Sequence, residues 1–246
     1  MNGSKPHYRR RVGILGVLCG CLAFTAAGRA ETTLEWALNF LGVSANSSSM
    51  KGANDSSNAG NIWTVMLAES KPVALTADGG YQWPVVHPDG ASVIAMRADA
   101  IVSVPVGGGP ARVLFPLGSV KKLVGFDRKN PSKILVLMAS AEDKLTPGEL
   151  SLTTGKATEA RNGHQQLDLI AHLEGQQRVY GELAVFPRTL TDTGITGAQI
   201  QWTDVYFTDR AGAARNISNC KPANCDQPSL SSDARRAVFI RSTGRR

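Results

Sequence analysis

The chain has 246 residues, enough for one sizeable hydrophobic core or two small ones, and its 25 glycines and 12 prolines favour short strands joined by turns. Its net charge of +7 is concentrated at the start, because the first 30 residues contain Lys5, Arg9, Arg10, Arg11, Arg29 and no acidic residue. Without these five, the 27 basic residues fall to 22, against 20 acidic residues. A nucleic-acid partner is therefore not expected.

Residues 1–30 have the three parts of an export signal: a basic start, an apolar run from Val12 to Ala27, and small residues. The apolar run is short for a permanent membrane helix, which needs about 20 residues. We therefore predict a cleaved signal peptide and a periplasmic or secreted protein. Two alternatives stay open. The stretch Leu18–Cys21 resembles a bacterial lipobox, in which Cys21 would carry a lipid anchor, or the segment could remain uncut in the membrane.

Residues 31–60 are predicted to form a short amphipathic helix and a flexible linker. The segment Glu31–Val43 has leucines at helical spacing, namely Leu34, Leu38 and Leu41. The segment Ser44–Gly60 has one methionine and no other large apolar residue, so it cannot bury enough surface to offset the cost of ordering. The folded domain is expected to span 61–246.

A turn signal and three apolar runs occupy the stretch Tyr81–Leu114. Pro88, Asp89 and Gly90 form a tight-turn sequence, so a returning strand should follow. Val93–Met96 is nearly all apolar and suits a strand covered on both faces, whereas Ile101–Val106 alternates like a half-covered strand.

This unit recurs in weaker form along the chain. Four strand-like runs start 39, 48 and 55 residues apart, at Ile62–Leu67, Ile101–Val106, Glu149–Leu152 and Asp204–Phe207. A second series follows turn signals, at Val93–Met96, Ile134–Met138, Val179–Tyr180 and Ala237–Ile240. A period of forty to fifty residues with several short strands is typical of propeller blades. On this reading, the segment Phe186–Trp202 is an insertion.

Two segments, Val85–Met96 and Gln227–Ser242, resemble the repeats of TolB-type, WD-like β-propellers. Asp204–Asp209 with Asn216–Ser218 is similar to another strand and ending of these repeats. The resemblance implies an all-β fold, a small β-propeller of about four blades, preceded by the signal segment, short helix and linker. Because the last unit stops after Ala237–Ile240 and the first starts at Ile62, one blade is expected to be closed by both termini. An incomplete array that pairs with another chain is the alternative.

No catalytic, cofactor or metal site is predicted, because the motifs of hydrolases, metalloproteases, phosphate-binding loops and dinucleotide-binding folds are missing from the sequence. His87 precedes a turn proline, which favours a structural role, and His172 lies in an apolar run. One acidic residue per unit occupies an equivalent turn, at Asp89, Asp127, Glu174 and Asp233, which turn chemistry alone explains.

Cys220 and Cys225 form a C-x4-C pattern, which predicts a structural disulfide that closes a local loop in an oxidising compartment. Zinc is the alternative, but it would need two more ligands at suitable spacing.

Trp63, Trp83 and Trp202 are expected to pack in the core between blades, with a ligand platform as the alternative. The sequence thus favours an exported, non-enzymatic TolB-like propeller that binds another envelope or secreted protein. A second hypothesis is a propeller that binds or acts on a small molecule or glycan through residues converging near its axis. A third is an accessory propeller that only orients the N-terminal helix or anchor.

Overall fold

The computed structural model describes residues 59–69, 71–127, 130–139, 145–160, 183–193, 197 and 199–243. Within these ranges the regular structure is entirely β, and no helix has the length and hydrophobicity to cross a membrane. Several predictions fall outside the described residues: the signal peptide, Cys21, the short helix, the linker, His172, Glu174 and the run Val179–Tyr180.

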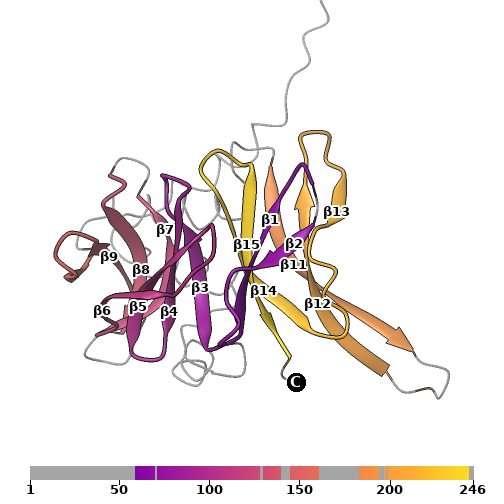
Figure 1. The fold of residues 1–246 in the computed structure, drawn as a ribbon, viewed down its shortest axis with the longest axis horizontal. Coiled ribbons are helices and arrows are strands. Elements are labelled where there is room, and N and C mark those ends of the chain that lie inside the picture. The colour runs from indigo at the N-terminus through magenta and orange to yellow at the C-terminus, as the bar shows by residue number, and fades with distance from the viewer. Residues whose placement is uncertain are drawn as a thin grey trace, which may run out of the picture.

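The described strands form antiparallel sheets that follow one another in space (Figure 1). One sheet has the order β14-β15-β1-β2, with bounds β14 (Asn224–Leu230), β15 (Arg236–Ser242), β1 (Asn61–Met66) and β2 (Pro72–Ala74). The next contains β3 (Tyr81–Val86), β4 (Ser92–Arg97), β5 (Ala100–Pro105) and β6 (Arg112–Pro116). A third contains β7 (Val120–Phe126), β8 (Lys133–Ala139), β9 (Leu145–Ser151) and β10 (Ala157–Glu159). The last is β11 (Ala184–Thr193), β12 (Gln199–Thr208) and β13 (Ala214–Asn216).

Strands from both ends of the described chain share one sheet. β1 pairs with β15 over its whole length, from Asn61 opposite Arg241 to Met66 opposite Arg236. The predicted neighbours Ile62–Leu67 and Ala237–Ile240 are therefore side by side. The number of blades and the closure of the sheets into a ring stay predictions, because the chain between β10 and β11 lies outside the described residues.

The segment Phe186–Trp202 is not the insertion that the sequence predicted. β11 and β12 pair through ten residue pairs, from Ala184 opposite Thr208 to Thr193 opposite Gln199. Threonine, aromatic and β-branched residues recur along both strands, and this composition favours extended structure. Pro187 obscured the pattern, since proline is tolerated only at special positions in a strand.

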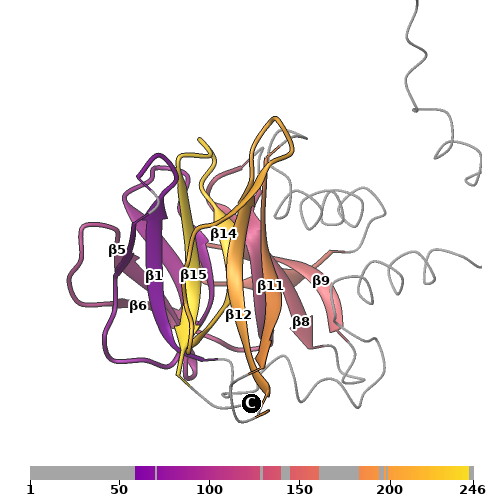
Figure 2. The same cartoon turned by 90° about the vertical axis from the view of Figure 1, so that its right-hand side faces the viewer.

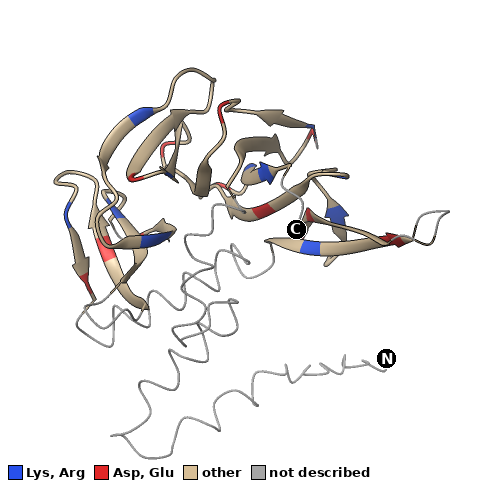
Figure 3. Ribbon diagram, turned by 90° about the horizontal axis from the view of Figure 1, so that it is seen from below, with Lys and Arg blue, Asp and Glu red and all other residues tan. Residues whose placement is uncertain are grey.

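The hydrophobic core lies between successive sheets rather than in a single centre. One cluster joins the β3–β6 and β7–β10 sheets and includes Ile101 and Ile134. A second joins β3–β5 to β1 and β15 and includes Val93 and Ile240. A third joins β1 and β15 to β11–β12 and includes Phe239. Face-to-face packing of neighbouring sheets is what a propeller-like arrangement requires. The sheets follow an arc when seen from below (Figure 3), and their strands run in roughly the same direction in the side view (Figure 2).

The sheets approach one another through the first strand of each. β3 contacts β7 on one side and β14 on the other, and β14 also contacts β11 and β12. Three of these strands have irregular register with the next strand of their own sheet, between Gln82 and Val85 in β3, Val120 and Lys122 in β7, and Asp226 and Ser229 in β14. A β-bulge re-aims side chains, and bulges are common next to functional sites.

Candidate functional site

The three irregular strands bring together Trp83 of β3, Lys122 of β7 and Gln227 of β14. The Lys122 Nζ lies 4.2 Å from the centre of the Trp83 ring. The backbone N–H of Trp83 donates a hydrogen bond to Gln227 Oε1 at 2.6 Å. The Gln227 backbone N–H in turn donates to Asp226 Oδ1 at 2.7 Å. The contact joins three sheets through residues that are widely separated in the sequence.

The backbone at this contact is strained. Trp83 has a φ of 50° and Gln227 a φ of 55°, in the left-handed region that side chains other than glycine rarely adopt. Each such residue costs on the order of 1–3 kcal/mol, so the surrounding structure must compensate. Strain of this kind, observed at two residues joined by one hydrogen bond, marks the cluster as a candidate for function.

Lys122 is unusual because a charged side chain is almost fully enclosed, with 7% of its surface exposed. Burial lowers the pKa of the Lys122 amine to about 8, while the nearby charge of Asp226 opposes that shift. The Trp83 Nε1–H is also buried and has no hydrogen-bond partner. Two side chains in contact thus supply different hydrogen-bond donors, the Lys122 ammonium and the unpaired Trp83 indole N–H.

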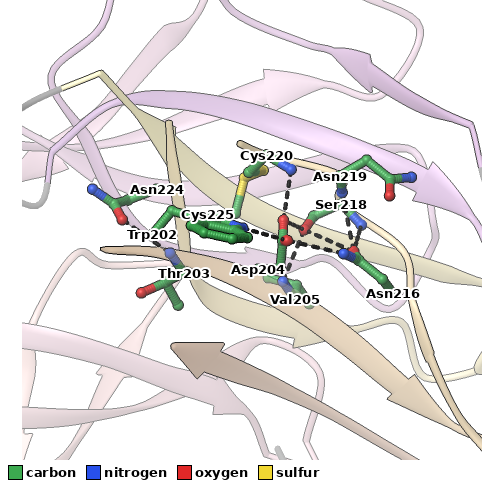
Figure 4. Close-up of a disulfide and its surroundings, with 10 residues drawn as sticks. All are labelled: Trp202, Thr203, Asp204, Val205, Asn216, Ser218, Asn219, Cys220, Asn224 and Cys225. Atoms are coloured by element: carbon green, nitrogen blue, oxygen red, sulfur yellow. Dashed lines mark hydrogen bonds between the residues drawn. A yellow bond between two sulfur atoms is a disulfide. The ribbon is translucent and has the colours of Figure 1, made fainter. Parts of the chain in front are cut away.

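A second polar cluster surrounds a buried carboxylate whose oxygens all accept hydrogen bonds (Figure 4). Asp204 of β12 is 3% exposed. Its Oδ1 accepts hydrogen bonds from Cys220 N at 2.5 Å and Ser218 Oγ at 2.9 Å, and its Oδ2 from Trp202 Nε1 and Asn216 Nδ2, both at 2.9 Å. Burial alone would raise the pKa of Asp204, but these hydrogen bonds outweigh it and hold the pKa below its ordinary value. A carboxylate with every lone pair in use is a structural anchor.

Asp204 anchors the loop that is closed by the disulfide between Cys220 and Cys225, whose Cα atoms are 6.0 Å apart. Both cysteines are completely buried and belong to the core cluster between β15 and β12. Asn224, just before Cys225, accepts a hydrogen bond from Thr203 N at 3.0 Å. The loop is thereby fixed to β12 at several points, and the cysteines are used in the disulfide instead of a zinc site.

The hairpin of β11 and β12 has two different faces. Val185, Val205 and Phe207 are buried on one face, in the core cluster shared with β1 and β15. The opposite face carries large residues that belong to none of the core clusters, namely Phe186, Leu190, Ile200, Trp202 and Tyr206. We call these five residues the hairpin face. Ile200 is 48% exposed, and the other four are half-buried.

Cations and ring contacts fix the geometry of the hairpin face. The rings of Phe186 and Tyr206 stack with centres 6.1 Å apart, and the Arg188 Cζ lies 5.4 Å from the Tyr206 ring. The Lys221 Nζ lies 4.6 Å from the Trp202 ring and pairs with Asp192 at 2.5 Å. The hairpin face is therefore an ordered aromatic surface with basic residues beside it.

The predicted turn residues lie in turns. The Asp89 Oδ1 accepts the Ala91 N–H at 2.8 Å, and the Asp233 Oδ1 accepts the Arg235 N–H at 3.1 Å. His87 contacts Asp89 at 2.9 Å and packs edge-on against Phe126, which agrees with a structural role. Among the described residues no group of three histidine, cysteine or acidic side chains could hold a metal ion.

The three tryptophans behave differently from one another. Trp63 and Trp83 pack against core clusters as expected, although both remain half-buried. Trp202 does not pack in a core cluster, so the prediction that it does is wrong. Its indole N–H donates a hydrogen bond to Asp204, and the Lys221 ammonium lies over its ring. Trp202 therefore belongs to the hairpin face.

Sequence reasoning missed Lys122, Gln227 and Asp204. Lys122 gave one signal, a charged residue inside the apolar run Val120–Phe126, which a solvated loop would explain equally well. Gln227 gave none, because its role depends on a strand from the other end of the chain. Basic and acidic residues are otherwise interspersed on the described ribbon (Figure 3).

No family model and no curated protein sequence matches the chain. Solved structures do match, at low identity. A structure described as TolB from Agrobacterium tumefaciens is 13% identical, with a TM-score of 0.36, and the match covers 74% of this chain and 61% of that one. The isopeptidase AtxE2 is 14% identical, with a TM-score of 0.28 and coverage of 56% and 20%. A eukaryotic initiation factor is 12% identical, with a TM-score of 0.27 and coverage of 68% and 43%. Likenesses this distant assign no function.

Proposed function

We propose that this chain is an exported, non-enzymatic protein-binding module with a propeller-like fold, acting on another envelope or secreted protein. The observation that carries the proposal is the hairpin face. Aromatic residues and arginine are enriched at protein interfaces, and the residues that dominate binding energy are mostly tryptophan, tyrosine and arginine. Trp202, Tyr206 and Arg188 are gathered on this one surface.

The hairpin face is also rigid, which lowers the entropic cost of binding. Asp204, on the same side of β12 as Trp202 and Tyr206, fixes the disulfide loop to this strand, and ring stacking orders Phe186 and Tyr206. The charge beside the face selects the partner. Because Arg188 is an exposed cation next to Tyr206, the surface fits an extended partner segment that combines apolar side chains with an acidic residue.

Export is supported by two independent features. The first 30 residues have the composition of a signal peptide, and the folded part contains a disulfide, a bond that persists in oxidising compartments. Attachment through a lipid on Cys21 stays an alternative form of the same proposal.

The test compares the exported chain with two variants of matched chemistry. Ile200→Asp places a charge on the hairpin face, whereas Val113→Asp places the same charge on β6, where Val113 is 65% exposed and far from the hairpin in the fold. Each protein is immobilised, exposed to envelope extract from its host, and the retained protein is then purified and titrated. We expect Ile200→Asp to weaken binding at least about tenfold, about 1.4 kcal/mol, and Val113→Asp to bind normally. Equal binding by all three proteins would remove the hairpin face from the proposal.

The alternative of a ligand near the axis is favoured by one observation, the cluster of Trp83, Lys122 and Gln227. It does not require catalysis.

A further inference from the structure

We propose that Trp83, Lys122 and Gln227 form a binding site for a carboxylate group, supplied by a peptide or by a small acid. The site lies where β3, β7 and β14 meet and shares no residue with the hairpin face. The inference therefore goes beyond the proposed function, and either one can fail without the other.

The donors determine the class of ligand. The Trp83 Nε1–H is buried without an acceptor, and a buried unpaired donor costs about 1–3 kcal/mol. The Lys122 Nζ lies over the same ring at 4.2 Å and offers three more N–H donors. Gln227 uses its Oε1 for the Trp83 backbone, which leaves its Nε2 as a further donor. A group with acceptors and no donors completes this arrangement.

The charges around the site favour a ligand with a single negative charge. Among the described residues, Lys122 is the cation that lies over the Trp83 ring, and Asp226, directly before Gln227, offsets part of its field. A dianion such as phosphate would meet one lysine and a nearby carboxylate, and would remain undercompensated. A carboxylate carries one charge and two oxygens, which suits an ammonium together with a neutral N–H donor.

The strained backbone holds the donors in place. Trp83 and Gln227 both have left-handed φ values, and the hydrogen bond of 2.6 Å between them ties the two irregular strands together. A site whose donors are fixed before binding loses little entropy when the ligand arrives.

A purely structural role predicts something different. If Trp83 only filled space, Phe would serve better, because it has the same aromatic character without the unpaired N–H. Trp83→Phe would then leave stability unchanged or raised and would affect nothing else. If the site binds a carboxylate, Trp83→Phe removes a ligand contact.

The test follows the indole N–H signals of the full folded chain by ¹⁵N NMR, with Trp83→Phe identifying the Trp83 signal. Three probes are titrated: an acetylated tripeptide with a free C-terminal carboxylate, the same tripeptide amidated, and acetate. We expect the free tripeptide to shift the Trp83 signal and the amidated one to leave it unchanged. Saturation by acetate as well would identify a small acid as sufficient, and saturation by the tripeptide alone would identify a chain terminus as the source.

Lys122→Met tests the cation. Methionine keeps most of the length of the side chain without the charge, and we expect the apparent affinity to fall about tenfold, the loss of one charge-assisted hydrogen bond of about 1.4 kcal/mol. Ile200→Asp, on the hairpin face, should bind the probe like wild type. An unmoved Trp83 signal with all three probes at millimolar concentration, in a chain whose other signals show it folded, would overturn the inference.

Discussion

Trp63 in β1 lies directly opposite Phe239 in β15, although the two residues come from opposite ends of the described chain. Phe239 is completely buried and belongs to the core cluster that also contains Val65 and Val205. The sheet that contains both ends is therefore held by side-chain packing as well as by backbone hydrogen bonds.

Truncating Phe239 should destabilise the whole domain. Phe239→Ala leaves a cavity between two sheets, and such changes cost about 3–5 kcal/mol. Val73→Ala is the control, because Val73 is 54% exposed on β2 of the same sheet and should change the free energy of unfolding by less than about 0.5 kcal/mol. Urea denaturation of both variants measures the difference. A small effect of Phe239→Ala would show that the two ends are not part of the cooperative fold.

Gly60→Ala should also destabilise the sheet. A Cβ at Gly60 would lie 2.2 Å from the carbonyl oxygen of Arg241, a backbone atom that cannot move away freely. Overpacking of this kind costs about 1–3 kcal/mol. At Gly107 nothing lies within 4 Å of the added carbon, so Gly107→Ala should be neutral or slightly stabilising. Thermal melting of the pair checks the expectation, which fails if both variants melt together.

Asp204 should make stability depend on pH in the acid range. Its pKa is depressed in the folded state, so its contribution is fully present above its unfolded pKa and is lost as the pH falls through the folded one. Below a pH of about 4 the wild type should therefore lose this stabilisation. Asp204→Asn should cost about 1–3 kcal/mol at neutral pH, because one acceptor is replaced by a donor facing donors.

The measurement is the free energy of unfolding of both proteins between neutral and acid pH. The difference between them should narrow as the pH falls. A constant difference would mean that the Asp204 charge contributes nothing beyond the shape of its side chain.

Lys122 should make stability depend on pH at the basic end, in the same direction as Asp204, because the free energy of unfolding should again rise with pH. Its folded pKa of about 8 lies below that of an unfolded lysine, about 10.4, so the unfolded chain binds more protons between these values. The free energy of unfolding of wild type, relative to Lys122→Met, should therefore rise from pH 8 to pH 10. Lysines and tyrosines common to both proteins cancel in the comparison. If this difference in the free energy of unfolding did not change with pH, the Lys122 amine would be solvated in the folded state.

Reduction of the disulfide should cost about 2 kcal/mol, as expected for a loop closed by residues five positions apart. Melting of the wild type with and without reductant measures it. A double variant with Cys220→Ala and Cys225→Ala is the control, since its melting temperature should not respond to reductant.

Strands and turns within each sheet were predictable from local sequence. The contacts between the first strands of neighbouring sheets, β3, β7 and β14, were not. Turn residues such as Asp89 and apolar runs such as Val93–Met96 encode their own structure within a few residues. The position of Lys122 over Trp83 depends on two bulges and on which sheets are neighbours, and no local pattern reports either. The hairpin of β11 and β12 was misread because one of its faces is buried and the other carries exposed residues, whereas the clearest strands of the repeat, such as β4, are covered on both faces.

The pairing of β1 with β15 sets an order of events during synthesis. β1 leaves the ribosome early and can pair with β2, but its partner on the other side, β15, is among the last strands described, so that edge of β1 stays unpaired until β15 emerges. Folding of that sheet cannot be completed while the ribosome is still producing the middle of the chain. A chain whose folding is delayed in this way stays unfolded during its synthesis. A secretion channel for unfolded chains accepts a polypeptide in that state.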